Sequence, residues 1–356
     1  MRILYFGTYE RDYPRNVQVI SCLRMAGVEV IESHAALWES ERHKLSPGPR
    51  TILRALRAEL RLARRSADGC DVVVVGYPGH LDMTAARRVA GSRPVVFNPL
   101  VSLEDTMVDD RGLLGRRSLR GRVLRAIDRR AFRTADLVVA DTGAHAAYFG
   151  THFDIPQERL AVCYVGAEDR LFSPGPRPES EFTVLFVGKL IPLHGVETIL
   201  AAAALAPEIP FRIVGSGQLD TALAKTPPNV RHESWVEYDR LPDLYRSAGC
   251  ALGIFGVSDK AGRVIPNKAF QALATGTPLV TSDTPAAREL LEDGRDALLV
   301  PPGDPHALAA AVRRVASDEV LAAEIGLRGR ETYAEHASEE VLGARWRSLL
   351  EELVTA

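Results

Sequence analysis

Residues 183–200 read TVLFVGKLIPLHGVETIL: an apolar run that ends at Gly188 and Lys189, and a helical pattern that opens at Gly195. A short, uninterrupted apolar run is typical of a strand that is buried on both faces of a parallel sheet. Similar runs, each followed by Gly, Pro, Asn or Asp, are RILYFG, DVVVVGYP, PVVFNP, DLVVADT, FRIVGSG, ALGIFG, PLVTSD and ALLVPP. Helix-like segments separate most of them, and this alternation predicts an α/β fold of parallel sheets covered by helices.

The alternation breaks at residues 166–181, GAEDRLFSPGPRPESE, where three prolines and mixed polarity indicate a linker. A chain of 356 residues is also longer than one ordinary core supports. The sequence therefore predicts two doubly wound, Rossmann-like domains facing a central cleft, over residues 1–166 and 181–339, with a linker over 167–180. In doubly wound sheets ligands bind beyond the carboxyl ends of the strands, so each loop that follows a strand is a candidate site.

The composition is that of a globular, water-soluble protein. No apolar run reaches the roughly 18 residues that a transmembrane helix needs, and MRILYFGTYERDYPR begins with a strand instead of a signal peptide. The four cysteines are scattered, without a C-x-x-C pair: Cys22, Cys70, Cys163 and Cys250. This pattern predicts a protein of the reducing cytoplasm, with neither a disulfide framework nor a zinc site.

The net charge of −2 hides an asymmetry between the two halves. Residues 1–166 hold 25 Lys and Arg against 19 Asp and Glu, a net charge of +6, and the remainder holds 19 against 27, a net charge of −8. A basic first half indicates an anionic partner there. Nucleic acid is not expected, because no basic surface with interleaved aromatic residues and no known reader motif appears.

Three segments of the second half are suited to an anion. Lys189 and the helix that opens at Gly195 both favour negative charge. Gly215 and Gly217 follow the run FRIV and would let a ligand approach the backbone closely. The third segment is RVIPNKAFQALATGTP, residues 263–278, which predicts a short helix with a lysine near its N-terminus.

In that helix Pro266 suits the first helical position and Gly276 the position just past the end. Lys268 and Gln271 are three residues apart and share a face. Taken singly, these features have plainer interpretations: a G-x-G turn without the third glycine of the dinucleotide motif, a solvated Lys189, and Lys268 on a polar helix face. Their order and spacing together favour an anion site.

From about residue 180 to 320 the chain resembles the C-terminal domain of the retaining GT-B glycosyltransferases of family 4, also called group 1. VGKLIPLHGVETIL is similar to that family's strand, G-R/K-x-x-x-x-K/H-G and helix, and IVGSGQLDTAL resembles its I-V-G-x-G segment. NVRHESWVEYDRLPDLYRSAGCALGIF and QALATGTPLVTSDTPAARELLEDGRDALLVPPGD are similar to the stretches that follow. In the first half, IDRRAFRTADLVVADT and VCYVGAEDRLFSP resemble the end of the N-terminal domain in the same enzymes.

The resemblance implies a GT-B fold in which residues 1–166 bind the acceptor and residues 181–339 bind a nucleotide-sugar donor. It also implies that a helix at about 340–356 packs back onto the first domain. The donor site implied in this way comprises Gly188, Lys189, His194, Gly215, Gly217, Trp235, Val236, Arg263, Val264, Asn267, Lys268 and Gln271.

The chain departs from the family's Glu-x7-Glu pattern, whose second glutamate holds the donor's ribose. Arg263 and Gln271 stand at the two glutamate positions. Gln271 can still hydrogen-bond ribose hydroxyls, and Arg263 can pair with a diphosphate. The form P-N-K-x-F-Q is similar to that of a subgroup of these transferases. The departures also leave open a catalytically inactive relative that binds nucleotide sugars.

The implied reaction moves a sugar from a nucleoside-diphosphate sugar, with uridine diphosphate expected, to a hydroxyl or amine with retention of configuration. Negative charge grows on the leaving phosphates, and fixed cations stabilise it; Lys189, Arg263 and Lys268 supply them. The chain has no D-x-D, the diphosphate–metal motif of the other glycosyltransferase fold. We therefore expect no metal and no cofactor.

The acceptor side is expected in the first half. His80 in GYPGHLD and Asp105 in FNPLVSLEDT follow strands and are candidates, with Lys189, for catalytic roles. A loop-packing histidine and a helix-capping aspartate are equally good interpretations. The expected acceptor is a small molecule, a glycan or a lipid-linked glycan.

Two helical segments carry arginine at helical spacing beside an apolar side. They are Arg54, Arg57, Arg61 and Arg64 opposite Ile52, Leu56, Leu60 and Ala63, and Arg122, Arg125, Arg129 and Arg133 beside Leu119, Val123, Ile127 and Ala131. The ordinary interpretation is a solvated face on a helix whose apolar side is core. The alternative is peripheral contact with anionic lipid at the inner face of the membrane, where related enzymes meet lipid-linked acceptors.

Other classes of protein stay open. An epimerase or a phosphorylase could share the fold, although the pyridoxal-binding lysine of a phosphorylase is not identifiable. A two-domain binding protein would close about a hinge. A nicotinamide-dependent oxidoreductase is disfavoured because G-x-G-x-x-G is missing.

Overall fold

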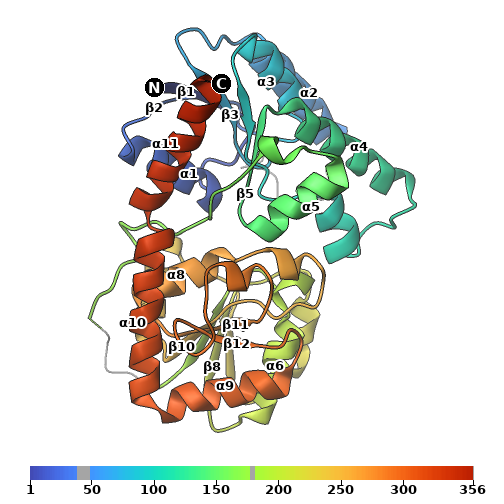
Figure 1. Ribbon diagram of the computed structural model, residues 1–356. Helices are drawn as coiled ribbons and strands as arrows, with labels where there is room; N and C mark the ends of the chain where they lie inside the picture. The colour runs from blue at the N-terminus through green and yellow to red at the C-terminus, as the bar shows by residue number, and fades with distance from the viewer. Residues whose placement is uncertain (38–48, 177–180, 356) are drawn as a thin grey trace. The chain divides into compact units, whose positions relative to one another are not determined.

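The computed structural model describes residues 1–37, 49–176 and 181–355 and divides the chain into two compact units. Unit 1 comprises Met1–Tyr164 and Glu339–Ala356, and unit 2 comprises Val165–Ser338. Each unit is built on a six-stranded sheet with helices packed on it (Figure 1). All strand pairs in both sheets are parallel, which confirms the predicted α/β class.

The sheet of unit 1 has the strand order β2-β1-β3-β4-β5-β6. Alternate residues of each strand point to opposite faces, so the unbroken apolar runs bury both faces under helices. The strands are β1 (Arg2–Gly7), β2 (Glu29–His34), β3 (Val72–Val75), β4 (Val95–Phe97), β5 (Leu137–Ala140) and β6 (Leu160–Val162). The helices are α1 (Pro14–Met25), α2 (Pro49–Leu62), α3 (Met83–Ala90), α4 (Leu119–Thr134), α5 (Gly143–Phe153) and α11 (Glu339–Thr355).

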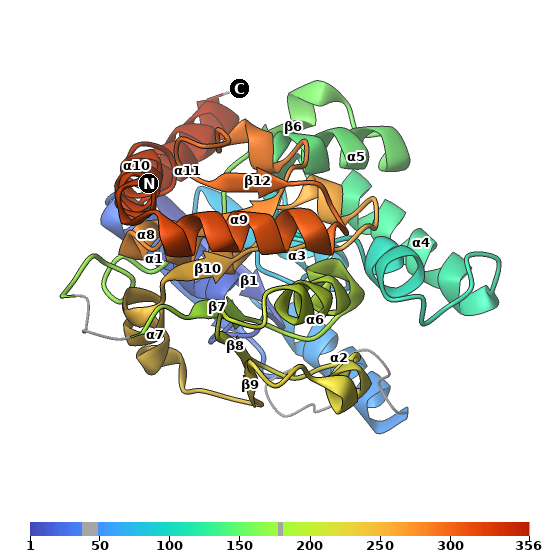
Figure 2. The ribbon, with the colours of Figure 1, turned by 90° about the horizontal axis from the view of Figure 1, so that it is seen from below.

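Unit 2 repeats this plan with the strand order β12-β11-β10-β7-β8-β9. Helix α9 crosses one face of the sheet, and it packs against α6 in the same core (Figure 2). The strands are β7 (Val184–Val187), β8 (Phe211–Val214), β9 (Val230–Glu233), β10 (Cys250–Leu252), β11 (Leu279–Ser282) and β12 (Leu298–Val300). The helices are α6 (Val196–Leu205), α7 (Leu241–Ser247), α8 (Asn267–Thr275), α9 (Pro305–Ser317) and α10 (Glu319–His336).

Helix α11, at the end of the chain, belongs to the core of unit 1. It lies beside α1 (Figure 1), and Trp346 and Leu350 are buried in one apolar cluster with residues of β1 and β3. Gly343 allows the close approach, because a Cβ there would lie 2.4 Å from the carbonyl oxygen of Cys22. Arg15 on α1 adds a cation–π contact, with its guanidinium 5.9 Å from the Trp346 ring centre.

The structure corrects two expectations about helices. Helix α8 begins at Asn267, one residue later than predicted, because Pro266 has an extended backbone and is the N-cap instead of the first helical residue. Gly276 is the left-handed C-cap, as predicted. The apolar sides of the two arginine-rich helices are core only in part. Leu56 and Leu60 on α2 are 57% and 62% exposed.

At the start of α4, Leu119 and Val123 are likewise exposed, whereas Ala131, on the same predicted apolar side, is buried as expected. Helix α4 also buries Asp128 and Phe132. Asp128 accepts hydrogen bonds from residues 102–104 inside the fold, so the buried face of α4 includes a carboxylate as well as apolar residues. The side chain of Ile52 lies outside the described residues.

Replacing Trp346 tests whether α11 is part of the core of unit 1. Trp346→Ala removes a fully buried aromatic side chain and should lower the free energy of unfolding by about 3–5 kcal/mol. The matched control is Val354→Ala on the same helix, because Val354 is largely exposed and should change stability by less than about 0.5 kcal/mol. Denaturant unfolding measures both, and equal effects of the two variants would contradict this placement of α11.

Candidate active site

Two glycine turns meet at the carboxyl ends of β7 and β8. Gly188 follows β7 with φ +153°, and Gly215 follows β8 with φ +131°. A Cβ at Gly215 would lie 2.0 Å from the carbonyl oxygen of Gly188, and one at Gly217 would lie 2.6 Å from that of Leu190. The Leu190 N–H also donates to the Ser216 carbonyl at 3.2 Å. These turns therefore pack backbone against backbone, at the sheet edge where doubly wound folds bind ligands.

Lys268, on the first turn of α8, reaches the same place. A Cβ at Gly188 would lie 2.6 Å from Lys268 Nζ and 3.2 Å from a ring carbon of His194. The Lys268 side chain is only 5% exposed, and Nζ lies 4.0 Å from the centre of the Phe186 ring. Burial holds the pKa of this lysine well below its ordinary value.

Gln271 lies one turn further along α8 and is also buried. Its amide oxygen accepts a hydrogen bond from the Tyr245 hydroxyl at 3.1 Å. His194 ends the short helical turn Pro192–His194, and its Nδ1 contacts the Lys189 carbonyl. Gly195 then adopts φ +65° and is the N-cap of α6, so the N-terminus of α6 follows the glycine turn after β7.

Other predicted donor-site residues are placed less directly. The Lys189 side chain is exposed, while Arg263, Val264 and Asn267 are partly buried in the segment that leads into α8. Trp235 is 72% exposed after β9, with its indole N–H 3.4 Å from Glu237, and Val236 is partly buried beside it. The described contacts therefore bring together Gly188, His194, Gly215 and Lys268, and no described contact joins Trp235 to them.

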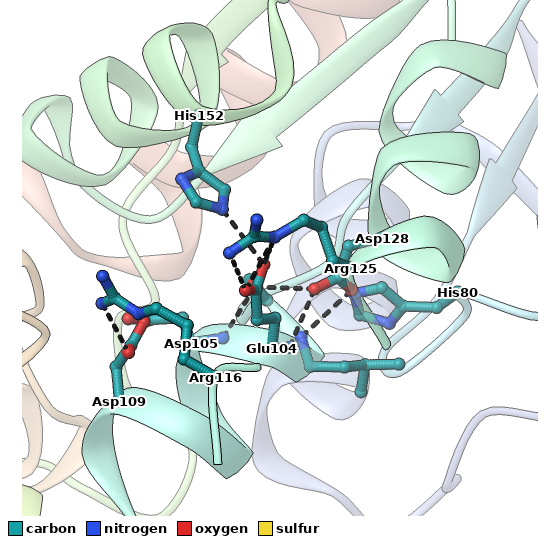
Figure 3. Close-up of polar contacts among 10 residues, drawn as sticks. His80, Glu104, Asp105, Asp109, Arg116, Arg125, Asp128 and His152 are labelled. Atoms are coloured by element: carbon teal, nitrogen blue, oxygen red, sulfur yellow. Dashed lines mark hydrogen bonds and ion pairs between the residues drawn. The ribbon is translucent and has the colours of Figure 1, made fainter. Parts of the chain in front are cut away.

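In unit 1, the ring of His80 lies beside Asp128 of α4 (Figure 3) and packs against an aromatic ring. Its ring lies edge-on to Phe97 at 5.1 Å, and Nε2 contacts the Val101 carbonyl at 3.1 Å and Asp128 Oδ1 at 3.4 Å. Because a carbonyl only accepts, Nε2 carries the proton. Burial lowers the pKa of His80, which keeps the ring neutral. This geometry favours the loop-packing interpretation of His80 over a catalytic one.

Asp105 begins a π-helical turn, Asp105–Asp110, and is buried. It is not the helix cap that the plainer interpretation supposed. Asp128 on α4 takes that role instead, accepting the N–H groups of Leu103 and Glu104 at 3.1 and 2.9 Å. Ser102 Oγ accepts the Asp105 N–H at 3.1 Å. Because π-turns are frequent at functional sites, Asp105 keeps its candidacy.

Glu104 holds this segment to two further helices (Figure 3). Its buried carboxylate accepts from Arg125 Nε on α4 at 2.8 Å and contacts His152 Nε2 on α5 at 3.1 Å. Burial would raise the pKa of Glu104, but the hydrogen bonds from Arg125 and His152 outweigh it and hold this pKa below its ordinary value. Nearby, Arg116 pairs with Asp109 at 2.8 Å.

The sequence analysis missed two buried pairs at the carboxyl edge of this sheet. Asp141 directly follows β5, and its Oδ1 lies 2.6 Å from Nδ1 of His145 on the first turn of α5. The spacing D-x-x-x-H at a strand end is the signal that could have indicated it. Asp82 accepts the Thr8 N–H at 2.9 Å just after β1. Burial, a hydrogen bond to Asp82 and its charge raise the pKa of Glu59 to about 10.

Among residues 1–37, 49–176 and 181–355, none of the helices combines the length and the apolar character of a membrane span. No group of three or more His, Cys, Asp or Glu side chains in these residues is placed to hold a metal ion. A cavity of about 440 Å³ lies at the amino ends of β7 and β8, lined by Thr183 and Pro210, and so at the opposite end of the strands from the glycine turns.

Solved structures share this architecture over nearly the whole chain. Sucrose-phosphate synthase from Thermosynechococcus elongatus is 18% identical, with a TM-score of 0.76 and 99% of each chain covered. HepE of Anabaena, solved in complex with UDP, is 15% identical, with a TM-score of 0.71 and 99% of each chain covered. These likenesses show that the protein has the GT-B fold of glycosyltransferases.

Models of known protein families match both halves of the sequence. Residues 3–166 match the glycosyl transferase 4-like domain, and residues 181–318 match glycosyl transferases group 1. The protein belongs to the group 1 glycosyltransferase family, as the sequence resemblance indicated.

Curated relatives agree at lower coverage. The D-inositol 3-phosphate glycosyltransferase of a Nocardioides species is 28% identical over 221 residues, covering 52% of this chain and 47% of that protein. The lipopolysaccharide core biosynthesis glycosyltransferase LpsE of Rhizobium meliloti is 24% identical over 226 residues, covering 62% and 65%. The chain thus spans about half to two thirds of the length of these relatives.

The lowered pKa of Glu104 makes a stability prediction with a definite sign. Its charged form is favoured in the folded state, so its stabilisation is present above the ordinary glutamate pKa and is lost as pH falls through the folded value. Glu104→Gln should cost about 1–2 kcal/mol of unfolding free energy at pH 7. That cost should shrink as pH falls below about 4.

Denaturant unfolding of both proteins from pH 3 to pH 8 measures the difference. The control is Glu158→Gln, because Glu158 is exposed and should change little at any pH. A cost of Glu104→Gln that stays constant from pH 3 to pH 8 would show that Arg125 and His152 do not hold the charged form.

Proposed function

We propose that the protein transfers a sugar from a nucleoside-diphosphate sugar to an acceptor hydroxyl or amine, with retention of configuration and without a metal ion. The observation that carries this proposal is the convergence of Lys268 on the glycine turns after β7 and β8, within a group 1 glycosyltransferase. Glycine turns let a diphosphate approach the backbone closely, and a lysine beside them supplies the counter-charge.

Uridine diphosphate is the expected nucleotide. The support is that HepE, which shares the fold, was solved with UDP and with UDP-glucose. Gln271 would hydrogen-bond ribose hydroxyls, and Arg263 with Lys189 would pair with the phosphates. Retention rests on the resemblance to retaining enzymes. The acceptor would bind on unit 1, where Asp105 lies in a buried π-turn near the carboxyl end of β4.

In the reaction, the bond between the sugar and the diphosphate breaks, and charge grows on the leaving phosphate oxygens. Cations already in place stabilise that charge without reorganising at the moment of reaction. Lys268 and the N-terminus of α6 supply such a field next to Gly188. The proton of the acceptor hydroxyl leaves as the new glycosidic bond forms, and the departing diphosphate is the base implied by the resemblance.

The donor site is tested by binding. UDP, GDP, dTDP, ADP and their sugars are compared in a thermal-shift screen with and without a chelator. We expect one diphosphate series to stabilise the protein, with the shift unchanged by the chelator. Stabilisation only in the presence of a divalent cation would overturn metal independence, and no shift with any nucleotide would favour an inactive relative.

Lys268→Ala separates phosphate recognition from base recognition. It should weaken binding of the nucleoside diphosphate on the order of ten- to hundredfold and binding of the nucleoside hardly at all. Isothermal titration measures both ligands. The control is Lys225→Ala, because Lys225 is an exposed lysine of the same unit. Equal losses for nucleoside and diphosphate would show that Lys268 does not hold phosphate.

We also propose that α2 rests on an anionic lipid surface. Leu53, Leu56 and Leu60 are exposed at helical spacing, and arginines flank them at positions 50, 54, 57 and 61. An exposed leucine row between arginines fits the boundary between lipid tails and anionic headgroups. It also fits a lipid-linked acceptor.

Vesicle sedimentation tests this contact at low salt. The protein should sediment with vesicles rich in anionic lipid and not with purely zwitterionic ones. The double variant with Leu56→Ser and Leu60→Ser should reduce sedimentation several-fold, whereas Leu327→Ser, an exposed leucine of α10, should not. The wild-type protein staying in the supernatant with anionic vesicles would refute the contact.

A further inference from the structure

The side chain of Lys268 lies in a narrow buried space, called the slot below, beside Phe186 and Gly188. Its Nζ sits over the face of Phe186, in the space that the missing side chain of Gly188 leaves open. The neighbours that the structure places around Nζ are the Phe186 ring, the backbone of Gly188 and the ring of His194. A lysine here is therefore removed from water as completely as a core residue.

No described group compensates a charge on this lysine. Among residues 1–37, 49–176 and 181–355, none forms a hydrogen bond with Nζ. From the turn after β7, His194 is the titratable group that faces the slot. Of α7, α10, β10 and β11, which pack against α8, α7 contributes the Tyr245 hydroxyl, and this bonds to Gln271. Burial is the cause that acts on the pKa of Lys268, which falls well below its ordinary value.

A cation–π contact with Phe186 does not change this balance. Phenylalanine attracts an ammonium more weakly than tryptophan does, and desolvation of an ammonium opposes the charged form more strongly. The N-terminus of α6 adds positive potential nearby, which also disfavours a positive charge while no anion is bound. The structure thus describes a lysine that is more stable as an amine.

We propose that Lys268 is stored as a neutral amine in the ligand-free protein and takes up one proton when the diphosphate of the donor binds. This inference rests on the proposed function, because it assumes that the diphosphate occupies the turns at Gly188 and Gly215. The step is balanced: the amine lone pair forms a new N–H bond with a proton from solvent, and the complex gains one positive charge. The diphosphate then supplies the counter-charge that the slot lacks.

Because donor binding and protonation of Lys268 are coupled, the affinity for the donor should fall as pH rises. Below the pKa of Lys268 in the ligand-free protein the amine is already protonated, so affinity does not change with pH. Between that value and the higher pKa of the complex, each unit rise in pH should weaken binding up to tenfold. A diphosphate held by permanently charged arginine would lack this dependence, because arginine stays protonated.

Proton uptake is measured by isothermal titration of the full chain with UDP-glucose. Titrations at one pH in buffers of low and high ionisation enthalpy give the number of protons taken up. UDP-glucose is the probe because its phosphates do not titrate near neutral pH, so the uptake belongs to the protein. We expect uptake approaching one proton at pH 8, falling to none in Lys268→Met and in Lys268→Arg.

Two control variants assign the proton. Lys225→Met, which changes an exposed lysine, should keep the uptake of the wild type. His194→Gln should also keep it, and loss of uptake in this variant alone would move the proton to His194 and overturn the proposal. Binding of UDP-glucose by the wild type without proton uptake would overturn the inference and leave the proposed function standing. Failure of every nucleotide sugar to bind would overturn both.

A second measurement needs no ligand. The unfolding free energies of the wild type and of Lys268→Met are compared from pH 6 to pH 10. A neutral Lys268 binds a proton only on unfolding, so the wild type should gain stability relative to the variant as pH rises, up to a tenfold change in the unfolding constant per pH unit. A difference that stays flat over this range means that the lysine is charged in the fold and overturns the proposal.

Discussion

The contact between the backbone turns after β7 and β8 is the constraint on which the candidate site depends. A side chain at Gly215 or Gly217 would overlap the carbonyl group of the neighbouring turn, so the two turns stay together only as glycine. Their contact holds the carboxyl ends of β7 and β8 together, and Lys268 fills the space that the missing side chain of Gly188 leaves open. The candidate site therefore depends on glycine at these positions.

The two units treat buried charge in opposite ways. In unit 1, Asp128 and Glu104 each accept several hydrogen bonds, which hold the segment after β4 against α4 and α5, and Glu104 also has Arg125 as a counter-charge. In unit 2, Lys268 is buried with no described counter-charge. A buried group with a counter-charge serves stability, whereas a buried lysine without one favours its neutral form until a ligand of opposite charge binds.

The features that could be predicted from the sequence are those that restrict which residue type can stand at one position. Burial on both faces leaves an unbroken apolar run, and close backbone approach requires glycine, so the α/β class and the position of Gly188 and Gly215 could be read directly. The orientation of α4 could not. It depends on Asp128, whose partners are residues 102–104, and a hydrophobic pattern contains no information about the partners of a buried carboxylate. The Asp141–His145 pair, in contrast, was missed although its D-x-x-x-H spacing after a strand is visible in the sequence.

Unit 1 is assembled from both ends of the chain, because Trp346 and Leu350 of α11 cover the face that α1 shares with β1 and β3. During synthesis, the six strands of unit 1 leave the ribosome well before α11 exists. All of Val165–Ser338 emerges in between. Unit 2 can therefore complete its core first, and the part of the protein that is made first is the last to finish folding.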